Sequence, residues 1–148
     1  MAKIFRPDVT VADLQKVSER TLVDSLGITL TELGDDFLRG TIRVDHRNCQ
    51  PMRILHGGAS VALAETLASL AANSVSSIDR EKAYCVGQEI NANHLRRAPE
   101  GTLVIGTARP FHIGSQSQVW GIELVNEAGQ RTCVSRITLA VVKRSSRA

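Results

Sequence analysis

The segment from His56 to Ser74, HGGASVALAETLASLAANS, constrains the fold more than any other part of the chain. From Ala59 onward it contains strong helix formers and neither proline nor glycine. Small apolar residues fall on nearly every side of the predicted helix, and a helix that is apolar all round is buried. We therefore expect one central helix that is enclosed by the rest of the protein.

Glu65 is the ionisable side chain inside this predicted helix. Burial of a carboxylate without a partner is costly, so an acid in such a place is usually paired or used. The structural alternative is a buried acid that is hydrogen-bonded to the backbone or to a histidine. The residue types by themselves leave both roles open.

The composition is that of a globular protein, with 148 residues, 43% hydrophobic and 22% charged. We expect a single domain over 1–148, with frayed ends at 1–9 and 143–148. The net charge of +3 is mild, the basic residues are scattered and aromatic residues are scarce, which argues against nucleic-acid binding. A mild positive charge suits a small anionic ligand better than a polyanion.

The three cysteines, Cys49, Cys85 and Cys133, have no CxxC spacing and are predicted to be free thiols in a reducing compartment. No residue cluster has zinc spacing, so we expect no metal site. The N-terminal sequence lacks the long apolar stretch of a signal peptide, and the central helix is too short to span a bilayer. These features predict a soluble cytoplasmic protein with no membrane partner.

The rest of the chain is predicted to form one more helix and six strands. Thr10–Leu26 is expected to be amphipathic, capped by Thr10 and ended at Gly27. Gly87 indicates a bulge or a close approach within its strand. Short turns make neighbouring strands antiparallel, so a helix against a curved sheet predicts an α+β architecture. The expected strands are Ile28–Leu33, Phe37–Val44, Tyr84–Leu95, Thr102–His112, Gln116–Val125 and Arg131–Val142.

This order of elements resembles the hot-dog fold, in which an antiparallel sheet wraps a long central helix. HGGASVALAETLAS, preceded by Gln50-Pro51 and followed by VGQEINANHLR and HIGSQSQVW, resembles one branch of the hot-dog acyl-CoA thioesterases. That branch is the phenylacetate-degradation and Arthrobacter-type 4-hydroxybenzoyl-CoA thioesterase group, within which the chain is most similar to the 1,4-dihydroxy-2-naphthoyl-CoA hydrolases and the enterobactin proofreading thioesterases. The resemblance covers about Gly27 to Val142, and its most specific part is HGG with a glutamate nine residues after the histidine.

The resemblance implies catalytic roles for five residues. Glu65 matches the catalytic carboxylate, which acts as a nucleophile or general base. Gly57 matches the residue whose backbone N–H polarises the thioester carbonyl. His56 and Gln50 match polar residues that position the thioester, and Ser69 matches a hydroxyl residue one turn beyond the carboxylate. No cofactor is implied, because CoA is part of the substrate.

The resemblance also implies which segments contact the CoA part of a thioester. His94-Leu95-Arg96 and Gly114-Ser115 match these segments. A guanidinium pairs well with phosphate oxygens, which favours Arg96 as a phosphate contact, while its alternative role is that of a solvated strand end. Gln116 stands where the family commonly has an arginine, so CoA and a carrier protein both stay open as the thiol carrier.

The acyl group is expected to be aromatic or of medium chain length. Met52 and Phe111 are our candidates to line its pocket, and the adaptable thioether of Met52 suits a broad one. The chain has Met52-Arg53 where the resembled family often has Phe-Gly. The residue pattern therefore leaves the identity of the acyl group open.

Thioester hydrolysis needs a group that attacks or activates water and donors for the oxyanion that develops. Glu65 can supply the first, and the unpaired N–H groups at the helix start near Gly57 can supply the second. On one helix these residues would lie about 12 Å apart along the axis, whereas both must reach to about 3 Å from one carbonyl carbon. We therefore expect a dimer in which Gly57 of one subunit faces Glu65 of the other. A tetramer of two such dimers is common in the resembled family.

Two other functions stay open beside hydrolysis. A hot-dog hydratase or dehydratase also pairs a histidine with a carboxylate, and a non-catalytic module would bind acyl-CoA without turnover. The position of His56 just before the glycines, with Glu65 further along the helix, favours hydrolysis. GxSxG, GxGxxG and P-loop motifs are absent from the sequence. Nothing in the sequence places Cys49 in the cationic environment that a nucleophilic cysteine needs.

Overall fold

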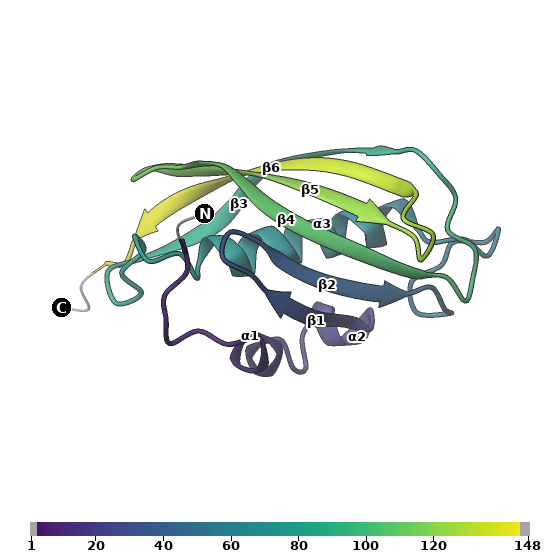
Figure 1. Cartoon of the computed structure of the whole chain (residues 1–148), viewed down its shortest axis with the longest axis horizontal. Coiled ribbons are helices and arrows are strands. Elements are labelled where there is room, and N and C mark those ends of the chain that lie inside the picture. Colours follow the sequence, from purple (N-terminus) through teal and green to yellow (C-terminus); the bar gives the residue numbers. More distant parts are fainter. Residues whose placement is uncertain (1–2, 146–148) are drawn as a thin grey trace.

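The computed structural model describes residues 3–145, and in this range one curved antiparallel sheet wraps a long helix (Figure 1). The strand order in the sheet is β1-β2-β4-β5-β6-β3, which confirms the predicted α+β hot-dog architecture. The strands begin and end within one residue of the predicted bounds. The elements are α1 (Val11–Val17), α2 (Leu22–Ser25), β1 (Ile28–Leu33), β2 (Leu38–Arg43), α3 (Gly57–Ala72), β3 (Ala83–His94), β4 (Leu103–Ile113), β5 (Ser117–Val125) and β6 (Arg131–Lys143).

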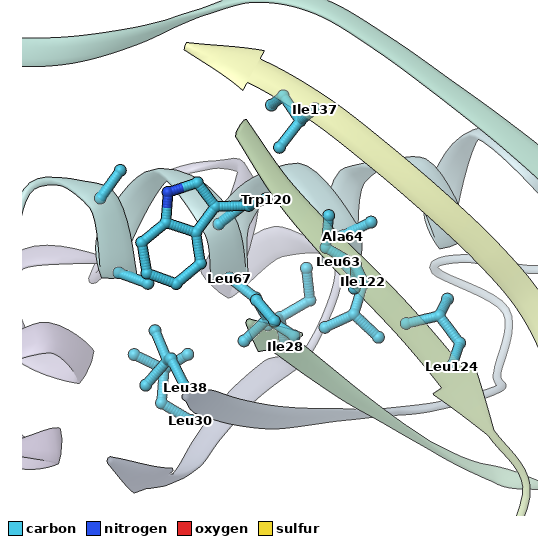
Figure 2. Packing of buried hydrophobic residues seen from close by; sticks show 14 of the residues in the cluster. Ile28, Leu30, Leu38, Leu63, Ala64, Leu67, Trp120, Ile122, Leu124 and Ile137 are labelled. Carbon is cyan, nitrogen blue, oxygen red and sulfur yellow. The ribbon is translucent and has the colours of Figure 1, made fainter. Parts of the chain in front are cut away.

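The central helix α3 begins after its N-cap His56 and ends before its C-cap Asn73. Figure 2 shows Leu63, Ala64 and Leu67 of this helix packed among side chains from the inner face of the sheet. The opposite side of α3, which carries Glu65, is only half-buried. The prediction of a helix enclosed on every side is therefore wrong for a single chain, because the sheet covers one face of it.

Two glycines allow α3 to lie close to the sheet. Gly40 of β2 and Gly106 of β4 are register partners, and both lie under Leu67. A Cβ atom would lie 2.9 Å from a Leu67 methyl at Gly40 and 2.7 Å from one at Gly106. Such distances are far inside van der Waals contact, so the Leu67 side chain occupies the space that side chains at these two positions would need.

The N-terminal helical region differs from the prediction of one helix over Thr10–Leu26. Thr10 caps α1 as expected, in a reciprocal capping box with Asp13. The helix then stops, because Arg20 adopts a left-handed conformation with φ of 58° and Thr21 caps the separate helix α2. The Ser18 hydroxyl donates to the Leu14 carbonyl, a local bond of the kind that competes with helix continuation.

The N-terminal segment is also more ordered than the frayed end predicted for 1–9. Phe5 is buried and stacks on Trp120 with ring centroids 6.4 Å apart. Arg6 donates hydrogen bonds to carbonyls of Asn73, Val75 and Ile78. At the other end β6 extends to Lys143, while 1–2 and 146–148 lie outside the described residues. Within 3–145, no helix has the length and apolar character needed to cross a membrane.

Candidate active site

The N-terminus of α3 presents a backbone N–H that has no protein acceptor among the described residues. His56 caps the helix, and its Nδ1 accepts from the Gly58 N–H at 2.8 Å. The N–H groups of Ala59 and Ser60 both donate to the His56 carbonyl, at 2.9 and 3.1 Å. The Gly57 N–H is thus left free at the positive end of the helix, where it can donate to an oxyanion.

A hollow of about 340 Å³ opens at this helix end. Its lining includes four of the predicted site residues, namely Gln50, Gly57, His94 and Arg96. The ring of His94 packs directly over Gly57, with Nε2 3.0 Å from the position that a Gly57 Cβ would take. Sequence reasoning missed Ser60 and Thr132, which are buried polar residues that also line the hollow. Ser60 lies three residues after Gly57, a helical spacing that could have indicated it.

Polar groups around the hollow are oriented by bonds within the chain. The Gln50 carbonyl oxygen Oε1 accepts from the Met52 N–H, which leaves the Gln50 amino group as a donor. The acceptor role of His56 Nδ1 places the ring proton of neutral His56 on Nε2. Arg96 is exposed and forms no ion pair with another described residue, so its guanidinium is available to an anionic ligand.

Glu65 lies in a second, smaller hollow of about 120 Å³ on the half-buried side of α3. Its Oε1 lies 2.5 Å from the position of a Cβ on Gly87, so a side chain at Gly87 would displace the carboxylate. The pairing of β3 with β6 shifts register between Gly87 and Glu89. Both the bulge and the close approach predicted at Gly87 are therefore confirmed. Glu65 takes part in no ion pair among residues 3–145.

Other predicted site residues lie outside both hollows within one chain. Ser69 is half-buried one turn after Glu65 on α3. Gly114 and Ser115 line a separate hollow of about 1010 Å³ beside the end of β6. Met52 is exposed in the loop before α3, and Phe111 is exposed with its ring over Gly121. The residues expected to surround one thioester are thus distributed over several surfaces of the chain.

The three cysteines of the chain are free thiols. Cys49, Cys85 and Cys133 form no disulfide, as predicted. Burial raises the pKa of the Cys85 and Cys133 thiols, which disfavours their reactive thiolate forms. Residues 3–145 contain no group of three or more histidine, cysteine or acidic side chains that could hold a metal ion.

Comparisons with known proteins indicate the family of the chain. A family model described as the thioesterase superfamily matches residues 52–133. The chain is 45% identical to the proofreading thioesterase EntH of Cronobacter turicensis, over 94% of this chain and 98% of that protein. It is 42% identical to the 1,4-dihydroxy-2-naphthoyl-CoA hydrolase of Escherichia coli, over 94% and 99% of the two chains. A crystal structure of a mutant thioesterase from Pseudomonas aeruginosa superposes with a TM-score of 0.91 at 38% identity, covering 95% of this chain and 99% of that one.

Proposed function

This chain belongs to the thioesterase superfamily, and we propose that it hydrolyses acyl-CoA or acyl-carrier-protein thioesters to a free acid and a thiol. The observation that carries the proposal is the free Gly57 N–H, which opens into a hollow that it shares with Gln50, His94 and Arg96. We favour aromatic or medium-chain acyl groups, because a relative named for an aromatic CoA thioester matches almost the whole chain.

In the proposed reaction the thioester carbonyl oxygen accepts a hydrogen bond from the Gly57 N–H. Glu65 either removes a proton from water, so that hydroxide adds to the carbonyl carbon, or adds to that carbon itself and is released by water later. In both routes negative charge develops on the carbonyl oxygen, where the helix N-terminus stabilises it. The C–S bond then breaks, and the thiolate leaves and takes up a proton.

Both groups must act on one carbonyl, and within one chain they cannot. Gly57 and Glu65 lie on the same helix, in two different hollows, at a spacing of about 12 Å along the axis. We therefore propose a dimer in which the Gly57 hollow of one subunit faces Glu65 of its partner. The half-buried Glu65 side of α3 supports this arrangement, as does β3, which ends the sheet and has no strand partner on its outer edge among the described residues.

The test is thiol release from a panel of aryl-, short-chain and long-chain acyl-CoAs, followed with a disulfide dye. We expect turnover with the intact protein and its loss in Glu65→Gln, with kcat/KM ranking the acyl groups. Dehydration or hydration of the acyl chain without thiol release would instead indicate a hydratase. Recovery of the intact acyl-CoA after long incubation would indicate a binding module.

The dimer is tested by mixing two inactive variants. Glu65→Gln removes the acid, and Gly57→Pro removes the polarising N–H. Mixed dimers of the two contain one site with both groups intact, so part of the activity should return on mixing. Failure to regain activity, despite mixed dimers shown by native mass spectrometry, would contradict a site shared between subunits.

A further inference from the structure

Asn48 is a buried polar residue, 3% exposed, in the irregular segment between β2 and α3. Its amide uses all of its hydrogen-bonding groups on the backbone. Nδ2 donates to the carbonyls of Leu26 at 3.0 Å and Arg43 at 2.9 Å, and Oδ1 accepts from the Asp45 N–H at 3.0 Å. The side chain thus joins the end of α2, the end of β2 and the turn that begins at Asp45.

The backbone of Asn48 holds the residue just before Gly57. The Asn48 carbonyl accepts from the His56 N–H at 2.9 Å. This bond closes a small hairpin, in which the Gln50 N–H also donates to the Ile54 carbonyl at 2.9 Å. Gln50 therefore lies within a hairpin that Asn48 holds closed, and Gly57 follows directly after it; both residues line the hollow at the start of α3.

The direction of the Gly57 N–H depends on the hydrogen bond between Asn48 and His56. The N–H belongs to the peptide plane that His56 and Gly57 share, so a rotation of His56 about its backbone dihedrals turns it. His56 is exposed, and its N–H bond to Asn48 fastens it to the rest of the chain. An oxyanion donor must lie within about 2.7–3.1 Å of the oxygen that it stabilises, which leaves little tolerance for such a rotation.

We propose that Asn48 is a positioning residue that sets the direction of the polarising Gly57 N–H. The inference rests on the proposed thioesterase function, and it adds a buried group outside the hollow that determines how well this donor meets the carbonyl. Asn48 acts through His56 and does not touch the substrate. Its loss should therefore lower kcat more than it raises KM.

The experiment compares Asn48→Asp with Asn73→Asp. Asn73 is a half-buried amide at the far end of α3 with the same pattern of hydrogen bonds: Nδ2 donates to the Ser69 and Cys85 carbonyls and Oδ1 accepts from the Cys85 N–H. In both variants a carboxylate replaces an amide that donates to two carbonyls, so both should be destabilised. Asn73 lies about 24 Å along the axis from Gly57, so only the Asn48 variant should disturb the polarising N–H.

The main readout is the carbonyl stretch of bound benzoyl-CoA, carbon-13 labelled at its carbonyl, in infrared difference spectra. These spectra are recorded in the Glu65→Gln background to prevent turnover. We expect a downshift on binding that Asn48→Asp reduces and Asn73→Asp keeps. With Glu65 present, kcat of Asn48→Asp should fall about 10- to 100-fold, the scale for a misplaced catalytic group, with KM changed less than about threefold.

A milder substitution, Asn48→Ser, allows the proposal to be tested even if Asn48→Asp does not fold. Asn48→Ser keeps a hydroxyl that can accept from the Asp45 N–H but cannot reach both Leu26 and Arg43, so it should give an intermediate downshift and faster hydrogen exchange of the His56 amide. An unchanged downshift and kcat in a folded Asn48 variant would overturn the positioning role alone. If the intact protein released no thiol from any thioester, the proposed function itself would fail.

Discussion

The two ends of α3 differ in whether side chains pair the backbone groups that the helix leaves free. At the C-terminal end, side chains donate to the last carbonyls: Asn73 to Ser69, Ser74 to Leu70, and Gln118 to Ala72. At the N-terminal end His56 caps the Gly58 N–H and leaves the Gly57 N–H open to a hollow. Any helix leaves unpaired groups at both ends. Here the carbonyls of the C-terminal end, which we call the closed end, receive side-chain donors, while the N-terminal end, which we call the open end, keeps one N–H unpaired.

The largest expected effect comes from removal of the free donor at the open end. Proline is favoured at the first helical position, and His56 has the extended conformation that a residue before proline adopts, with φ of −64° and ψ of 134°. Gly57→Pro should therefore fold and yet lose about 10²- to 10³-fold in kcat. Gly57→Ala adds a Cβ beside His94 but keeps the N–H, and should lose much less. Similar losses in the two variants would show that space, and not the donor, matters there.

Substitutions at the closed end should lower the stability of the protein and leave the rate of the reaction unchanged. Gln118 is fully buried, and its Oε1 accepts from Trp120 Nε1 at 2.9 Å. Gln118→Leu leaves the Trp120 N–H without an acceptor and removes one of the donors to the Ala72 carbonyl, which should lower the free energy of unfolding by about 1–3 kcal/mol. Denaturant titration measures this, and kcat per folded molecule should stay close to that of the intact protein. In a Trp120→Phe background, where the indole donor is already gone, Gln118→Leu should cost less than it does alone; full additivity of the two losses would argue against the bond.

Glu65 lies in the middle of α3, away from both ends of the helix. In Gly87→Ala the new Cβ would lie 2.5 Å from Glu65 Oε1, and because a carboxylate is the end of a flexible side chain, it should move aside. We expect a loss of about tenfold in kcat with little change in the melting temperature, since small displacements of a reacting group are costly to rate. Val86→Ala, on the neighbouring exposed residue, is the control. An unchanged kcat in Gly87→Ala would show that the position of the carboxylate seen here is not the working one.

The smallest effect concerns the turn that supports the open end. Hydrogen bonds from Arg47 lower the pKa of Asp45 from 3.8 to about 2. A lowered folded-state pKa adds stability above the unfolded value, which is lost as pH falls from about 4 to about 2. Because Asp45 lies near the surface, we expect less than about 1 kcal/mol. Melting temperatures of the intact protein and Asp45→Asn should differ at pH 7 and converge toward pH 2; parallel curves would contradict the assignment.

Features that follow from a pattern along the sequence could be predicted, and features that depend on contacts formed by folding could not. Periodicity and turn residues placed α3 and the strands to within one or two residues, and the glycine in β3 indicated its bulge. The burial of the Gln118 amide was missed, although Gln118 alternates with the buried Trp120 and Ile122 along β5. The break at Ser18–Thr21 was missed because hydroxyl–backbone bonds leave no periodic trace.

The residues of the candidate site also differ in whether a sequence pattern could indicate them. His56, Gly57 and Glu65 could be proposed together because they are close in sequence, at the start of one helix and along it. His94 over Gly57 and Asn48 behind His56 depend on chain segments that meet only after folding. Their positions carry no local pattern. Met52 and Phe111 were expected beside one acyl group, and within one chain they lie apart from both hollows.

The packing of Leu67 over Gly40 and Gly106 limits which substitutions this protein can accept. Larger side chains beneath the helix would lift it, and would displace the Gly57 N–H and the Glu65 carboxylate together because both belong to the same helix. Changes of size at the exposed side chains of Met52 and Arg53, by contrast, leave the packing of Leu67 untouched. Libraries confined to these two side chains should retain folded variants far more often than libraries directed at Gly40 and Gly106.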